Sequence, residues 1–135
     1  MAEGKVEFEL VSPERLLLSE PVDMVVVPGE EGDFGVLFQH APFISVVRPG
    51  VIKAHNGGKV TDQIFVSGGF AEVTTTRCTV LAEQAVAVDE IDRGEAEQQL
   101  RDAREDLADA QDKHRRDQAE RHIAIAEAMV SAASG

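Results

Sequence analysis

The chain has 135 residues and a formal net charge of −12, from 13 basic and 25 acidic side chains. This length fits one ordinary domain, or a small domain with an appendage, and the apolar share of 43% argues against a wholly disordered chain. The acidic balance argues against a nucleic-acid-binding module, because no basic face is offered to a phosphate backbone. The lone cysteine, Cys78, forms no intrachain disulfide and fits a reducing compartment. No apolar run approaches the ~20 residues of a membrane span, so membrane association has to come through a partner.

The composition of the chain changes near residue 89. All six phenylalanines and all five prolines lie before this point, whereas alanine is the commonest residue after it. The first segment has the residues of strands and turns, and the second has the residues of helices. We therefore predict an N-terminal β domain over residues 1–88 and a C-terminal helical domain over residues 89–135.

The first segment is typical of short strands. Val6, Phe8 and Leu10 alternate with charged residues, which is the period of a strand with one buried face. Asn56-Gly57-Gly58 is typical of a hairpin turn, because Asn and Gly accept a positive φ. Further strand-forming runs, separated mostly by Pro or Gly, cover residues 22–27, 34–38, 43–47, 51–54, 60–66, 70–76 and 79–81. This spacing predicts a β-sandwich or flattened barrel.

The second segment has no proline and no interior glycine from Glu95 to Ser134. Asp92 and Glu95 fit a capping box at the start of a helix. Apolar residues then recur at four-three spacing in two stripes that are out of phase by two residues: Ala96, Leu100, Ala103, Leu107 and Ala110, followed by Ala119, Ile123, Ala126, Val130 and Ala133. This pattern predicts an antiparallel helical hairpin with its turn within residues 111–116. One continuous helix with a phase slip is the alternative.

Small residues dominate both stripes, so the helices would approach closely but bury little apolar area. We expect a marginally stable hairpin that can open. Residues 89–112 carry a net charge of −7 and residues 113–135 a net charge of +1, so weak attraction between the helices can hold the hairpin closed. The basic cluster that begins at Lys113 either meets an acidic partner or is a solvated helix face.

A search for catalytic chemistry finds little. The four histidines have no Cys or His at metal-ligand spacing, so we expect no metal. No nucleophile, base and orienting group converge, which argues against an enzyme, and no motif indicates a cofactor. Cys78 lies on a predicted strand and is expected to be an inert, small apolar residue.

The first segment resembles the epsilon subunit family of bacterial F-type ATP synthase, the counterpart of the mitochondrial delta subunit. Five motifs carry the resemblance by their order and spacing: Gly32-Asp33-Phe34-Gly35, His40-Ala41-Pro42, Arg48-Pro49-Gly50-Val51-Ile52, Phe65-Val66-Ser67-Gly68-Gly69-Phe70-Ala71-Glu72-Val73 and Thr79-Val80-Leu81-Ala82-Glu83. The acidic, alanine-rich helical segment follows where the family has one, so the resemblance covers nearly the whole chain.

The resemblance implies a ten-stranded β-sandwich followed by a two-helix hairpin, and a non-catalytic rotor role in proton-driven ATP synthesis. In the family the sandwich binds the gamma subunit and the polar loops of the c-ring, at the cytoplasmic face of the bacterial inner membrane. A carboxylate at this edge could pair with a basic group of a c-subunit loop. By position, the c-ring-facing edge would consist of Glu31, Asp33, His40, Ala41 and Pro42.

The resemblance also implies a regulatory tail. In many bacterial relatives the helical segment can extend along gamma and slow ATP hydrolysis by contacting the beta and alpha subunits. The candidates for contacts with acidic residues of beta are Lys113, Arg115, Arg116 and Arg121.

Some relatives bind ATP at the start of the tail, through an Ile/Leu-Asp-x-x-Arg-Ala pattern. Here Ile91, Asp92 and Ala96 keep the pattern, but Glu95 stands in place of the arginine. A carboxylate at this position would repel a phosphate, so we expect no tight ATP binding.

The alternative to a rotor subunit is a free-standing, small-ligand-binding β-sandwich with a helical dimerisation tail. A dimerising coiled coil usually has Leu or Ile at its seam, and the repeated alanine disfavours this alternative.

Overall fold

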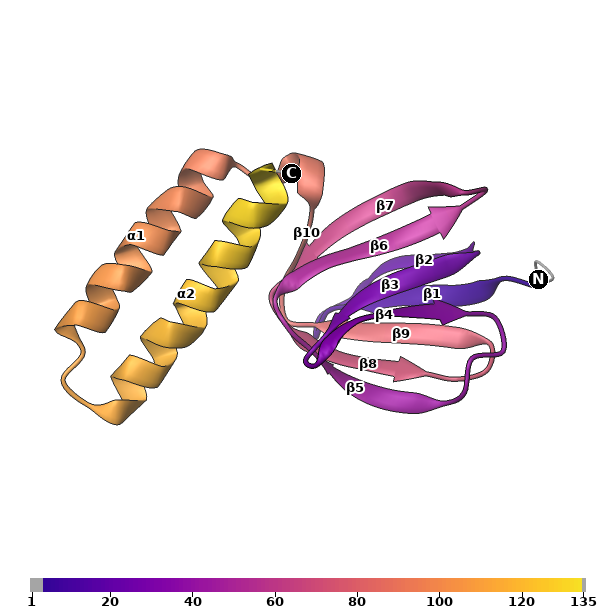
Figure 1. The fold of residues 1–135 in the computed structure, drawn as a ribbon, viewed down its shortest axis with the longest axis horizontal. Coiled ribbons are helices and arrows are strands. Elements are labelled where there is room, and N and C mark those ends of the chain that lie inside the picture. Colours follow the sequence, from indigo (N-terminus) through magenta and orange to yellow (C-terminus); the bar gives the residue numbers. More distant parts are fainter. Residues whose placement is uncertain (1–3, 135) are drawn as a thin grey trace. The chain divides into compact units, whose positions relative to one another are not determined.

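The computed structural model describes residues 4–134, which form two compact units that divide between Ala87 and Val88. The first unit contains ten strands and the second contains a short 3-10 helix and two α-helices (Figure 1). The strands are β1 (Val6–Val11), β2 (Leu16–Val22), β3 (Met24–Gly29), β4 (Gly32–Leu37), β5 (Phe43–Val47), β6 (Gly50–Asn56), β7 (Lys59–Val66), β8 (Gly69–Val73), β9 (Arg77–Ala82) and β10 (Ala85–Ala87). The helices are η1 (Val88–Glu90), α1 (Arg93–Asp109) and α2 (Lys113–Ser134).

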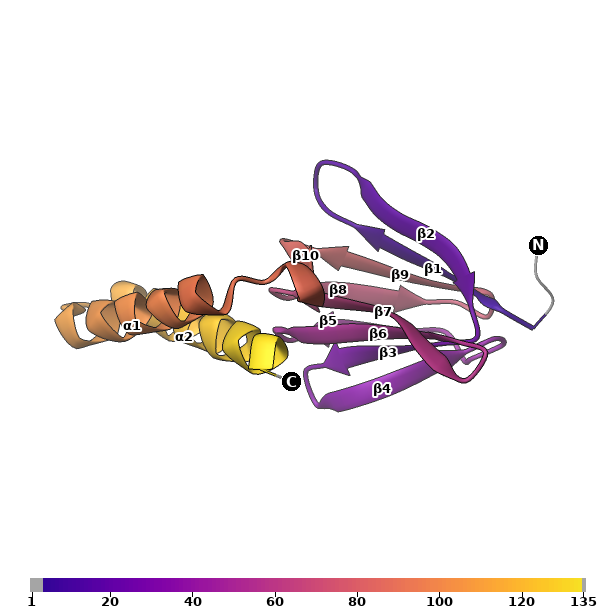
Figure 2. The ribbon, with the colours of Figure 1, turned by 90° about the horizontal axis from the view of Figure 1, so that it is seen from above.

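The ten strands form one sheet that curls into two layers. One layer has the order β2-β1-β9-β8-β5, and the other has the order β10-β7-β6-β3-β4. Figure 2 shows β1, β2 and β9 in one layer and β3, β4 and β6 in the other. The layers share one backbone pairing, between Gly29 on β3 and Val47 on β5. The β-sandwich followed by two helices confirms the predicted fold class.

The core between the layers comes from strict alternation along the strands. Val6, Phe8 and Leu10 are all at most 1% exposed, while their neighbours on β1 are only half-buried. Val25 and Val27 on β3 and most of the other core residues are also β-branched or small. Such side chains pack well between pleated layers. Cys78 is one of these core residues.

The strand predictions differ from the structure in four places. The run predicted over residues 22–27 takes in Val22, which is the last residue of β2, whereas β3 begins at Met24. β2 was missed because Leu16, Leu17 and Leu18 form a continuous apolar run without alternation. β10 was missed because it has only three residues and pairs with Ile64–Val66 of β7, distant in sequence. The run predicted over residues 70–76 ends at Val73, since Thr74 Oγ1 accepts a hydrogen bond from Arg77 N at 3.0 Å and closes a turn.

The second unit is an antiparallel hairpin (Figure 1). Residues 110–112 connect the helices, and the continuous-helix alternative is wrong. Asp92 caps α1 by accepting a hydrogen bond from Glu95 N at 3.1 Å, and Asp112 caps α2 by accepting one from Arg115 N at 2.8 Å. The fully buried helical residues are all alanines: Ala96, Ala103, Ala119 and Ala126. The larger side chains of the two predicted stripes are half-buried.

The close charge contacts between the two helices are few, and the expected attraction between their net charges stays a prediction. Between the helices of the described chain there is one ion pair, from Arg104 of α1 to Glu127 of α2 at 3.7 Å. It joins a base of the acidic helix to an acid of the more basic helix, which is the reverse of the polarity of the two net charges. Both side chains are more than half exposed, and such a pair contributes little to stability.

A carboxyl pair links the two layers of the sandwich. The side chain of Glu20 on β2 hydrogen bonds to that of Asp62 on β7, and this bond, burial and the charge of Asp62 raise the pKa of Glu20 to about 7. The folded chain therefore holds a proton on Glu20 at a pH where the unfolded chain has released it. As a consequence, the stability from this group is lost as the pH rises from the ordinary value of 4.5 towards 7.

We expect Glu20→Gln to remove this pH dependence, because the amide needs no proton to donate a hydrogen bond to Asp62. Thermal unfolding should show the variant more stable than the unmodified chain at about pH 8 and nearly equal to it at about pH 4. Glu72→Gln, which removes an exposed carboxylate of β8, is the control. Equal slopes of stability against pH for the unmodified chain and Glu20→Gln would contradict the assignment.

Candidate docking edge and helical tail

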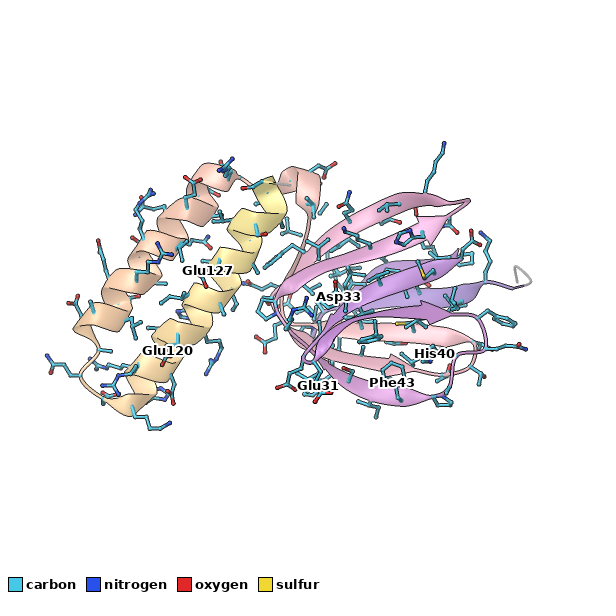
Figure 3. The ribbon with its side chains drawn as sticks, viewed as in Figure 1. Glu31, Asp33, His40, Phe43, Glu120 and Glu127 are labelled. Carbon is cyan, nitrogen blue, oxygen red and sulfur yellow. The ribbon has the colours of Figure 1, made fainter. Side chains whose placement is uncertain are left out.

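An open groove runs along the side of the sandwich where β4 and β5 are the edge strands of opposite layers. Its volume is about 530 Å³. Glu31, Asp33 and His40 line it, together with Phe34, Phe43 and the outer residues of β5. Ala41 and Pro42 are exposed in the loop between β4 and β5. All five residues predicted for the docking edge thus lie on β4, in the turn before it or in the loop after it. Figure 3 shows Glu31 at the β3–β4 turn and His40 beside Phe43 near the other end.

The β3–β4 turn presents two exposed carboxylates, Glu30 and Glu31. The turn is tight, and a Cβ atom on Gly29 would lie 2.8 Å from the carbonyl oxygen of Gly32 and 2.9 Å from the Phe34 ring. A glycine is therefore required at position 29 for the turn to close against Phe34.

Asp33 differs from Glu31 because it has a partner within the chain. Its Oδ1 accepts a hydrogen bond from Arg48 Nη2 at 2.6 Å, and Arg48 Nη1 donates to the carbonyl oxygen of Gly29 at 2.6 Å. The sequence did not indicate this pairing, because the two residues are fifteen positions apart and meet only through the β3–β5 link. Glu31 is thus the predicted carboxylate whose charge is available to another molecule.

The other end of the groove is held by aromatic contacts and by one unusual backbone conformation. The rings of Phe34 and Phe43 meet edge to face at 5.0 Å, and His40 lies 5.3 Å from Phe43. Gln39 has a φ of 67°, rare for a side-chain-bearing residue, and its N–H donates to Thr75 O at 2.6 Å. Sequence reasoning missed both phenylalanines, although they flank the His40-Ala41-Pro42 motif closely. The loop is therefore fixed before any partner arrives.

A second surface, not predicted from the sequence, lies on the outer face of the layer that ends in β5. Val46, Phe70, Leu81, Val11 and Leu16 are successive cross-strand neighbours, so their side chains form one row across five strands. Four of them are 43–56% exposed, and Ile44 on the same strand as Val46 is 72% exposed. The sequence carries a partial signal for this surface, because Phe70 and Leu81 alternate with the buried residues Ala71 and Val80 and therefore face solvent. Only the pairing register of the strands shows that they form one row.

The four basic residues predicted for the tail contacts are all exposed. Lys113 pairs with Asp117 at 2.7 Å, and Arg115 lies 3.6 Å from Asp112. Within residues 4–134, Arg116 and Arg121 form no ion pair. The structure brings Lys113, Arg115 and Arg116 together in the first turn of α2, and Arg121 follows on the same helix five to eight residues later.

The residues left from the ATP pattern have structural roles. Asp92 caps α1, and Ala96 is fully buried. Arg93, the only arginine close by in sequence, is bound to Glu97 at 2.9 Å on the same helix. The position of the missing arginine is held by Glu95, whose backbone N–H binds the Asp92 carboxylate. This arrangement offers acceptors rather than donors to a phosphate.

Other kinds of site have no support in the described part of the chain. Residues 4–134 contain no group of three His, Cys, Asp or Glu side chains that could hold a metal ion. None of their helices is long and apolar enough to cross a membrane. Burial raises the pKa of Cys78 to about 12, so its thiol is not reactive.

Comparisons with known proteins match both units. Residues 5–88 match the family model of the β-sandwich domain of the ATP synthase delta/epsilon chain, and residues 92–135 match the model of the C-terminal domain of the ATP synthase epsilon chain. The chain is 55% identical over 132 residues to the ATP synthase epsilon chain of Paramagnetospirillum magneticum, covering 98% of each chain. It is 54% identical to that of Rhodospirillum rubrum, covering 96% of each.

A solved structure agrees with these relatives. The chain superposes with a TM-score of 0.84 and 28% identity on a chain of the Euglena gracilis mitochondrial ATP synthase, in a structure of OSCP, F1 and c-ring. The match covers 98% of this chain and 83% of the Euglena chain.

We expect no saturable ATP binding at micromolar concentrations, because Glu95 repels phosphate and Arg93 is paired with Glu97. Isothermal titration of the full chain with ATP and Mg²⁺ checks this. Glu95→Arg, which completes the pattern with Ile91, Asp92 and Ala96, is the matched variant and should bind more tightly. Micromolar binding by the unmodified chain would contradict the prediction.

Proposed function

The chain belongs to the ATP synthase epsilon chain family, and on this premise we propose that it is a non-catalytic rotor subunit of the central stalk that couples gamma to the c-ring. The observation that carries this proposal is the match of both units to the family models, together with relatives aligned over nearly the whole of both chains. The neighbouring structure from Euglena is an assembly that contains F1 and a c-ring. We further assign residues 1–88 to the coupling role and residues 89–135 to regulation.

The two surfaces of the sandwich suit two different partners. The row that runs from Val46, at the rim of the groove, through Phe70 to Leu81 is apolar, and burying such a row is the main source of stability in a permanent interface. We assign this face to the gamma subunit, which has to transmit torque without dissociating. The side walls of the groove, by contrast, carry charge at the β3–β4 turn and suit the polar loops of the c-ring.

On the c-ring side, Glu31 supplies the available carboxylate, and we propose that it pairs with a basic group on a c-subunit loop. His40, Ala41 and Pro42 form the other end of the same edge, where the fixed loop gives the contact its shape. An exposed charge pair of this kind orients a contact more than it strengthens it. The firm attachment therefore lies on the gamma side.

The helical tail has the properties that a regulatory element needs. Its fully buried seam consists of alanine and its one interhelical ion pair is long and exposed, so opening the hairpin costs little free energy. We propose that the opened tail slows ATP hydrolysis, with Lys113, Arg115, Arg116 and Arg121 facing acidic residues of the beta subunits and neighbouring alpha. Arg116 and Arg121 give up no ion pair within the described residues when they make this contact.

As part of the F1 stalk, the subunit is peripheral to the membrane. Since both named relatives are bacterial proteins, we propose that it works at the cytoplasmic face of the plasma membrane and reaches the membrane only through the complex.

We expect Leu81→Glu to weaken the association with gamma by roughly ten- to hundredfold, because it places a charge in the middle of an apolar interface. The control is Val60→Glu on β7, since Leu81 and Val60 are 45% and 43% exposed. Co-purification of gamma with the tagged, full-length chain measures the effect. Loss of gamma in Val60→Glu but not in Leu81→Glu would contradict the assigned face.

We expect Arg116→Glu with Arg121→Glu to raise ATP hydrolysis by the assembled complex towards the rate of a variant that lacks residues 89–135. Loss of each charge pair should shift the inhibited-to-active ratio by about threefold. Arg101→Glu, an exposed arginine of α1, is the control. If removal of residues 89–135 leaves hydrolysis unchanged, the tail has no inhibitory role.

A further inference from the structure

The guanidinium of Arg48 bridges two parts of the chain on either side of the β3–β4 turn. Arg48 follows β5 directly, at the start of the connection to β6. One end of its guanidinium donates to the Gly29 carbonyl and the other to Asp33 Oδ1, both at 2.6 Å. The side chain thus spans the β3–β4 turn, from the last residue of β3 to the second residue of β4.

Two backbone hydrogen bonds flank the same contact. Arg48 N donates to Pro28 O at 2.9 Å, and Glu30 N donates to Val46 O at 2.9 Å. Close packing accompanies them, since a Cβ atom on Gly50 would lie 2.9 Å from Pro28 Cβ. The turn is therefore held on one side by backbone bonds and across its width by Arg48.

This geometry gives the three nearby acidic residues different roles. Asp33 is matched in charge and geometry by Arg48 of its own chain, and its side chain is 61% exposed, whereas that of Arg48 is 42% exposed. Glu30 and Glu31 project from the turn that this pair holds, and both are exposed. A charge in a rigid turn meets a partner group with less loss of conformational entropy than a charge in a mobile one.

We infer that Arg48 is a positioning residue for the docking edge, which holds the β3–β4 turn so that Glu31 faces a cationic group of the partner. Asp33 is the internal anchor of Arg48 and makes no contact with that cation through its charge. The inference rests on the proposed c-ring edge and assigns its residues to separate tasks.

The variant Asp33→Asn distinguishes two roles for Asp33, an internal anchor for Arg48 and a direct contact with the partner cation. The asparagine oxygen still accepts a hydrogen bond from Arg48, but the residue carries no charge for a partner cation. Asp33→Ala removes both the acceptor and the charge, and Arg48→Ala removes the donor. Glu31→Gln removes the charge proposed to meet the partner and leaves the anchor intact.

The test measures the binding of F1 that contains each variant subunit to purified c-rings at low ionic strength. We expect Asp33→Asn to bind like the unmodified complex, and Asp33→Ala, Arg48→Ala and Glu31→Gln each to bind about two- to fivefold more weakly. Arg77→Ala is the control, because Arg77 also pairs with a carboxylate, Glu9, at 3.7 Å. Equal weakening by Asp33→Asn and Glu31→Gln, or unchanged binding of Arg48→Ala, would overturn the inference.

If the proposed docking edge is wrong, Glu31→Gln also binds c-rings normally. A second measurement, on the full-length chain in solution, then tests the positioning role of Arg48 by itself. Backbone ¹⁵N relaxation at Glu30 and Glu31 should show increased mobility in Arg48→Ala and Asp33→Ala but not in Asp33→Asn, with thermal unfolding nearly unchanged in all three. Unaltered mobility in Arg48→Ala would overturn the positioning role. A merely structural role would instead lower the unfolding temperature.

Discussion

Strands of the two layers of the sandwich pair at the position where Gly29 on β3 faces Val47 on β5, and the docking edge depends on this link. At this point the sheet passes from one layer to the other, so that β4 and β5 become neighbouring edges that are not paired with each other. Unpaired edges normally invite unwanted strand pairing. Here the charged turn at one end, the loop fixed by Gln39 at the other and the aromatic pair between them give the open side a defined shape and a charged end.

The helical hairpin is under a different constraint, because its two helices have to pack together and also be able to separate. A seam whose fully buried members are Ala96, Ala103, Ala119 and Ala126 brings two helices close together but removes little apolar surface from water. The capping residues Asp92 and Asp112 stabilise each helix separately, which favours helices that keep their structure when they part. Stable helices with a weak seam suit an element with two arrangements that differ by a few kcal/mol.

The sequence predicts those features that depend on local pattern. The alternation of β1, the cap at Asp92 and the two alanine stripes all follow from periodicity and capping chemistry within a few residues. Features that depend on register could not be predicted. Asp33 meets Arg48, and Val46, Phe70 and Leu81 form one row, only because of how distant strands pair. The positions of Glu31 and His40 on one edge were inferred from the family resemblance, and their availability for binding became clear only from the contacts around them.

The central claim is that the sandwich holds gamma on its apolar face and the c-ring along its acidic edge. Site-directed cross-linking in the assembled complex tests this most directly, with a photoreactive maleimide attached to Glu31→Cys or to Phe70→Cys. Native Cys78 does not compete, since it is fully buried and its pKa is raised to about 12. The account predicts cross-links from position 31 to the c subunit and from position 70 to gamma. Cross-links from position 31 to gamma, or from position 70 to the c subunit, would contradict it.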